Sequence, residues 1–263
     1  FFINLNTTTN AKFNNFIIKN NDWLTDYALF MSIKDEFGGK SWFNWDEDIR
    51  LRKPEALKYY SEKLANKVKF YQFLQYEFSQ QWLDLKAYAN SNFIQIIGDI
   101  PLYIAADSSD AWASPELFLL DEKTGMPQMV AGVPPDYFSA TGQLWGNPIY
   151  RWDYMKTTGF SWWIKRIEAS LRLADILRLD HFRGLCAYWQ VPYGEETAVN
   201  GEWKQAPGNE LFEALQETFG NIPILAEDLG LITADVNALR EKYNLPGMKI
   251  LQFAFDSEES SSK

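Results

Sequence analysis

The sequence predicts an α/β fold that forms part of a β/α barrel, and three observations support this prediction. Apolar runs typical of buried parallel strands alternate with segments of helical periodicity. Two of these runs end in a carboxylate, at Asp180 and at Glu227, and a Gly follows each carboxylate three or four residues later. The chain of 263 residues is long enough for one such domain. Four strands are expected, fewer than the eight of a complete barrel, at residues 93–99, 174–180, 222–227 and 248–255.

The first part of the chain is expected to be mostly helical, as an insertion over about residues 20–90. Pro54 fits the first turn of a helix, where its missing N–H would have no partner. Apolar residues then recur every three or four positions and predict one buried helical stripe, made of Leu57, Tyr60, Leu64, Val68, Tyr71, Leu74 and Phe78.

The segment of about residues 103–152 contains Pro and Gly throughout and is expected to be an irregular insertion over a substrate cleft. Helices are expected at about 160–172, 209–219 and 233–243, between the later strands. The polar residues 257–263 are expected to be a disordered tail. We therefore expect residues 1–263 to form one partial catalytic barrel domain with helical and loop insertions.

Composition excludes several classes of function. The net charge of -10 argues against nucleic acid or an anionic membrane as partner, because both require clustered Lys and Arg. One His and one Cys exclude a His/Cys metal cage, so no metal and no cofactor are expected. The chain has no run of 18 apolar residues and no secretory leader pattern, which predicts a cytoplasmic protein.

The two strand-end carboxylates predict glycosidic-bond chemistry. Asp180 and Glu227 would lie at the carboxyl ends of parallel strands, the catalytic face of a β/α barrel. One Asp and one Glu from neighbouring strand ends supply what this chemistry needs, a nucleophile or base and an acid. Arg178 lies two residues before Asp180 on the same strand face, where it would orient that carboxylate and keep it ionised. The structural alternatives are an Arg–Asp pair at a strand end and a carboxylate at a helix start.

Five stretches in order resemble the 4-alpha-glucanotransferase (amylomaltase) family, glycoside hydrolase family 77. They cover residues 98–112, 131–139, 142–148, 178–184 and 225–230. The resemblance implies a (β/α)8 TIM barrel of the amylomaltase type. It also implies a retaining enzyme that acts on α-1,4-glucans and maltooligosaccharides, with glucose or another glucan as acceptor.

The resemblance also assigns roles to individual residues. It implies that Asp180 is the nucleophile, that Glu227 is the general acid/base and that Arg178 holds Asp180. It further implies six sugar-binding residues, which are Asp107, Asp136, Tyr137, Phe138, Trp145 and Asn147. Among these, Trp145 is our choice for stacking on a glucose ring.

Three further polar residues have open roles at this point. His181 fits either a hydrogen bond to a sugar hydroxyl or a core histidine. Arg183 is expected to support the site by orienting barrel carboxylates. Asp99 ends its strand at the same face and fits either a structural pair with Arg183 or a substrate contact.

The resemblance implies a third catalytic Asp preceded by His, and no such pair occurs in these residues. We therefore expect an internal fragment that is inactive alone, from an active transferase. The alternatives are an α-amylase-like retaining glucan hydrolase that uses the same carboxylates, and an inactive carbohydrate-binding fragment of such an enzyme.

Overall fold

The computed structural model describes residues 7–137, 139–230 and 232–255, which form two compact units. The first unit contains the residues up to Ile94, then Tyr103–Met155 and Trp189–Glu202. The second contains Gln95–Leu102, Lys156–Tyr188 and the residues from Trp203 onward. None of the helices in the described ranges is both long and apolar enough to cross a membrane.

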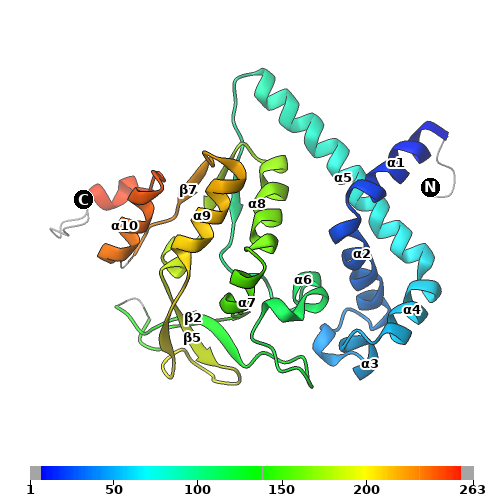
Figure 1. Cartoon of the computed structure of the whole chain (residues 1–263), viewed down its shortest axis with the longest axis horizontal. Helices are drawn as coiled ribbons and strands as arrows, with labels where there is room; N and C mark the ends of the chain where they lie inside the picture. Colours follow the sequence, from blue (N-terminus) through cyan, green and yellow to red (C-terminus); the bar gives the residue numbers. More distant parts are fainter. Residues whose placement is uncertain (1–6, 138, 231, 256–263) are drawn as a thin grey trace. The chain divides into compact units, whose positions relative to one another are not determined.

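The second unit is built on a three-stranded parallel sheet. Its order is β1-β4-β7, with β1 at Ile97–Ile100, β4 at Ile176–Leu179 and β7 at Ile224–Ala226. The helices are α8 (Ser161–Leu173), α9 (Gly208–Phe219) and α10 (Ala234–Lys242) (Figure 1). Helix α8 packs against β1, β4 and α9. The unit also contains two 3-10 turns, η4 (Phe182–Leu185) after β4 and η5 (Leu251–Phe255) after α10.

The core of this unit lies between the sheet and the helices. Leu177 and Leu179 are almost fully buried, because β4 has a neighbour on each side and packs against α8. Ala226 of β7 is buried as well. The helices supply the other side of the core with the buried residues Trp163, Ile167, Leu211, Phe212 and Leu215. This packing fixes the strand ends on which the two carboxylates are carried.

The first unit contains a helical part and most of an antiparallel sheet, of which residues 187–188 and 203–205 belong to the second unit. The helices are α1 (Thr7–Lys19), α2 (Asn21–Glu36), α3 (Glu47–Arg50), α4 (Pro54–Lys63), α5 (Ala65–Ser91) and α6 (Ser109–Ala113), with the 3-10 turns η2 (Trp42–Asn44) and η3 (Pro115–Leu117). The sheet has the order β3-β2-β5-β6, from β2 (Met129–Val133), β3 (Gln143–Pro148), β5 (Ala187–Pro192) and β6 (Glu202–Gln205). Helix α7 spans Trp152–Thr157.

The expected helix after Pro54 forms, but as two helices, and the expected buried stripe is wrong. Of that stripe only Leu64 is buried, while Leu74 and Phe78 are 41% and 48% exposed. The buried residues of α5 are Phe73 and Tyr76, which pack on Phe13 of α1. The face of α5 that meets α1 and α2 is therefore rotated from the one that periodicity favoured.

Two other expectations about strands need correction. The run 248–255 is not a strand, since Leu251–Phe255 forms a 3-10 turn. An apolar run of this length does not distinguish strand from helix by periodicity alone. The antiparallel sheet was missed, because β2 and β3 lie within 103–152 and β5 and β6 lie in the Gly-rich stretch after Gly184. Long-range pairing, which local composition does not encode, produces those strands.

Candidate active site

Strand β4 places Arg178 and Asp180 on one face of the parallel sheet. Arg178 is the register partner of Asp99 in β1, and Asp180 directly follows β4. Side chains two residues apart on a strand project to the same face, and directly paired residues of neighbouring strands do so too. The three side chains therefore lie on one face of the sheet near the carboxyl ends of β1 and β4.

Arg178 joins two carboxylates. Its Nη1 donates to both carboxylate oxygens of Asp99, at 2.7 and 2.8 Å. Its Nη2 lies 2.8 Å from Oδ1 of Asp180. Such charge-assisted contacts orient a carboxylate as well as neutralise it. The sequence left Asp99 with either a pair with Arg183 or a substrate contact, and in the structure its ion-pair partner is Arg178.

Glu227 directly follows β7 and is held by backbone N–H groups. The N–H of His181 donates to Oε2 at 2.9 Å, and the N–H of Leu229 donates to Oε1 at 3.2 Å. The main chain of Glu227 is bonded to the β4 side as well, through its N–H to the carbonyl of Leu179 at 3.1 Å. The carboxylate orientation is therefore set by backbone geometry.

The pKa of Glu227 is raised above its ordinary value, chiefly because burial disfavours the charged form. The negative charge of Asp180 raises it further, while the N–H groups of His181 and Leu229 and the charge of Arg178 oppose the shift. A carboxyl with a raised pKa beside an ion-paired carboxylate is the arrangement of an acid and a nucleophile.

His181 has a left-handed backbone, with φ 50° and ψ 47°. Desolvation, with the positive charge of Arg183, lowers the pKa of its imidazole to about 4, so the ring is neutral at pH 7. Gly184 leaves room for this turn, since a β-carbon there would overlap Leu102 and lie 2.9 Å from Cδ2 of His181. A neutral ring still forms hydrogen bonds, so a sugar contact stays a prediction.

Arg183 lies in η4, and its guanidinium stacks over the indole of Trp203 with 4.4 Å to the ring centroid. Burial lowers its pKa, and the negative charge of Asp235 in α10 opposes that shift. The expected role in orienting the barrel carboxylates is not tested by these contacts.

Two of the expected sugar-binding residues use their polar atoms inside the first unit. Asp107 forms an ion pair with Lys34 of α2 and accepts a hydrogen bond from the N–H of Trp42 at 3.3 Å. Asn147 donates from Nδ2 to the carbonyl of Ile104 at 2.7 Å. Both side chains thus hold the backbone of this unit in place, and direct sugar contacts by them stay predictions.

The other expected sugar-binding residues of this unit are more accessible. Oδ1 of Asp136 accepts the N–H of Ser139 at 2.8 Å, and the neighbouring Tyr137 is 97% exposed. Trp145 in β3 is 38% exposed, with its indole N–H donating to Gln143 at 3.1 Å. Phe138 lies outside the described residues. The exposure of Tyr137 and Trp145 leaves aromatic surface for a sugar ring.

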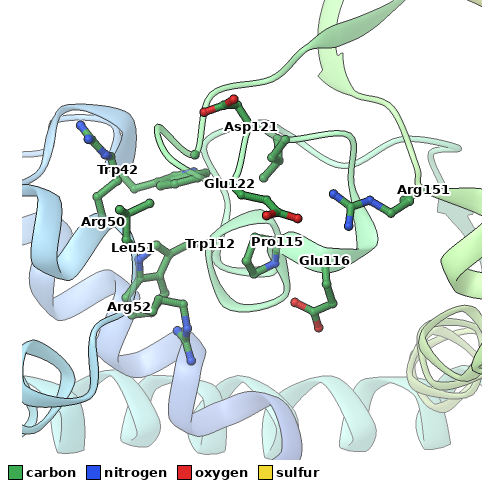
Figure 2. A pocket seen from close by; sticks show the side chains of 12 residues that line it. Trp42, Arg50, Leu51, Arg52, Trp112, Pro115, Glu116, Asp121, Glu122 and Arg151 are labelled. Atoms are coloured by element: carbon green, nitrogen blue, oxygen red, sulfur yellow. The ribbon is translucent and has the colours of Figure 1, made fainter.

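A cavity of about 240 Å³ lies in the first unit (Figure 2). Guanidinium groups and carboxylates surround it, including Arg50, Arg52, Arg151 and Glu122. Its walls include Trp42 and Trp112, each only 1% exposed, so neither offers an open ring face. None of the sequence-predicted site residues that the structure describes lines it.

Sequence reasoning missed the pairing of Asp99 with Arg178 and the N–H donors to Glu227. The signal for the first was the position of Asp99 at the end of an apolar strand, since neighbouring parallel strands bring equivalent ends together. Backbone donors carry no sequence signal, because every residue except Pro has one.

Comparison with known proteins identifies relatives over nearly the whole chain. The family model for 4-alpha-glucanotransferase, glycoside hydrolase family 77, matches residues 2–263. A 4-alpha-glucanotransferase of Synechocystis sp. is 55% identical over 262 residues, which are 99% of this chain and 52% of that protein. One of Clostridium butyricum is 51% identical over 260 residues, 99% of this chain and 53% of that protein.

The fold has a solved counterpart. The structure of amylomaltase from Streptococcus agalactiae in complex with acarbose superposes with a TM-score of 0.93 at 44% identity, covering 98% of this chain and 52% of that one. The chain thus spans about half the length of the relatives it matches. From the family model and these relatives, the chain belongs to the 4-alpha-glucanotransferase family, glycoside hydrolase family 77.

Proposed function

We propose that this protein is a 4-alpha-glucanotransferase. It transfers segments of α-1,4-glucan, supplied as maltooligosaccharides or longer dextrins, to the 4-hydroxyl of glucose or of another glucan. The observation that carries the proposal is the pairing of an arginine-bound Asp180 with Glu227, whose pKa burial and the charge of Asp180 raise. Family membership supports it.

The reaction is a retaining double displacement. In the first step Asp180 attacks the anomeric carbon, and Glu227 protonates the oxygen of the departing glucan. This leaves a glycosyl ester on Asp180 and an ionised Glu227. In the second step Glu227 takes the proton of the acceptor 4-hydroxyl, and the acceptor oxygen attacks the anomeric carbon. The bond from this carbon to Asp180 breaks, which restores the carboxylate of Asp180 and the protonated Glu227. We expect a separation of about 5–5.5 Å between these carboxyl groups, as in retaining enzymes.

The wider architecture belongs to the same proposal. We infer that β1, β4 and β7 are neighbouring strands of a (β/α)8 barrel, since strands joined by helices give a parallel sheet with its reactive groups at the carboxyl ends. Tyr137 and Trp145 are proposed to contact glucose rings. The absence of nucleic acid and membrane partners and the cytoplasmic location remain predictions from the sequence.

The test is an assay on maltotriose with the protein expressed from its complete reading frame. Transfer converts two maltotriose molecules into glucose and maltopentaose, and the number of reducing ends does not change. Hydrolysis adds one reducing end for each bond cleaved, which would support the hydrolase instead. Asp180→Asn should lower turnover on the order of 10⁴-fold or more with the fold retained. Absence of both products from the unsubstituted protein would overturn the proposal.

A further inference from the structure

Asp228, the residue after Glu227, binds the chain segment Pro246–Met248. Its carboxylate is 10% exposed. Oδ1 accepts the N–H of Met248 at 2.7 Å, and Oδ2 lies 3.2 Å from Nε of Arg240. A β-carbon on Gly247 would overlap the carboxylate of Asp228, so only glycine permits this close approach.

The residue on the other side of Glu227 contacts the same segment. The N–H of Ala226 donates to the carbonyl of Pro246 at 2.8 Å. Glu227 is therefore flanked in the chain by two residues bound to Pro246–Met248. Its own carbonyl accepts the N–H of Phe182 at 3.2 Å, so the main chain is held on both sides of β7.

Arg240 connects this arrangement to the end of α10. Its Nη1 donates to the carbonyl of Leu245 at 3.3 Å, next to the bound segment. Its other carboxylate neighbour, Glu241, lies 3.7 Å from Nη2 and is 71% exposed. An ion pair at such an exposed carboxylate contributes little, whereas a buried carboxylate that loses its partners is costly. Asp228 is thus the carboxylate on which the segment depends.

We propose that Asp228 is a positioning residue for Glu227. It anchors Pro246–Met248 along the side of β7 opposite β4 and so fixes the backbone that carries the acid/base. The catalytic part of this inference rests on the proposed transferase function. Asp228 itself takes no part in proton transfer. Its loss would let the main chain of Glu227 shift, and a displacement of about 1 Å from productive geometry costs on the order of 10²-fold in rate.

The experiment compares Asp228→Ala and Asp228→Asn with the matched control Glu241→Gln, which removes the exposed neighbour of the same Arg240. Amide hydrogen exchange at Met248 reports the anchor, and kcat and KM with maltotriose report its effect. For Asp228→Ala we expect loss of the slow exchange at Met248 and a fall in kcat on the order of 10²-fold, with KM nearly unchanged. Asp228→Asn keeps an acceptor for Met248 and should recover part of the protection and part of kcat.

Glu241→Gln should match the unsubstituted protein in every measurement. If the amide of Met248 exchanges at the wild-type rate in both Asp228 variants, Asp228 does not anchor the segment. Lost protection with an unchanged kcat would overturn the positioning role, and so would a fall in kcat of equal size in Glu241→Gln. If Asp228→Ala does not fold, Asp228→Asn carries the same test.

If the unsubstituted protein does not act on maltotriose, the proposed function fails. The amide exchange of Met248 and that of Glu227, whose N–H donates to the carbonyl of Leu179, then decide this inference.

Discussion

The backbone N–H of His181 donates a 2.9 Å hydrogen bond to Oε2 of Glu227, which connects the residue after the proposed nucleophile to the proposed acid/base. The left-handed backbone of His181 accompanies this contact. A rearrangement at the end of β4 would therefore displace the carboxyl groups of both Asp180 and Glu227, because the chain at Asp180 also determines where the N–H donor to Glu227 lies.

Asp180→Asn should lower the pKa of Glu227. The charge of Asp180 is one of the causes that raise this pKa, and the substitution removes that charge while keeping the side-chain shape. NMR titration of the labelled Glu227 carboxyl in the two proteins measures the change. Asp235→Asn is the control, since that carboxylate acts on Arg183. An unchanged or higher pKa in Asp180→Asn would contradict the electrostatic coupling.

Glu227→Gln should trap a glycosyl adduct on Asp180 when the donor has a good leaving group. Such a donor leaves without acid assistance, whereas the second step still requires a base to activate the acceptor. Mass spectrometry of peptides should place the added mass on Asp180. The double variant Asp180→Asn with Glu227→Gln should carry no adduct, and an adduct on any other residue would exclude Asp180 as the nucleophile.

His181 should make the protein less stable as the pH falls from about 6.5 towards 4. Its pKa is about 4 in the folded state, below the ordinary value of 6.5 that it has in the unfolded chain, so the unfolded chain binds the proton first. The stability is complete above pH 6.5 and is lost through this window, by roughly 2 kcal/mol between pH 7 and pH 5.

His181→Asn tests this sign, because Asn tolerates a left-handed backbone and does not titrate. Urea unfolding at pH 7 and pH 5 should show a smaller loss of stability for the variant. Equal losses in the two proteins would show that the imidazole of His181 is not the group responsible.

The 263-residue chain by itself should self-associate through strand β1. Among the described residues β1 is an edge of the parallel sheet, and its Ile97 is 58% exposed. Exposed apolar edge strands pair with other chains, and Lys prevents this. Light scattering should therefore show less association for Ile97→Lys. Ile18→Lys is the control, since Ile18 is 74% exposed but lies on helix α1, and equal effects of the two would argue against the strand edge.

The sequence alone was sufficient for the features that depend on local pattern. Apolar runs ending in Asp180 and Glu227 predicted strand-end carboxylates, and β4 and β7 end one residue before them. The expected helices at 160–172 and 209–219 correspond to α8 and α9 within one residue at each end. Periodicity and chain punctuation encode such elements because each depends on residues close together in the chain.

The tertiary structure alone decided which groups meet. Asp99 and Arg178 are 79 residues apart, and only the parallel register of β1 and β4 makes them neighbours. The fate of residues 248–255 also depended on distant partners, since a strand there requires continuous backbone pairing with β7. Among the described residues, the backbone hydrogen bond from β7 to this part of the chain is the one from Ala226 to Pro246, which lies before the run. The N–H groups that hold Glu227 are common to nearly every residue, so their role comes from geometry: a backbone donor acts on a carboxylate only where the fold brings the two within hydrogen-bond distance.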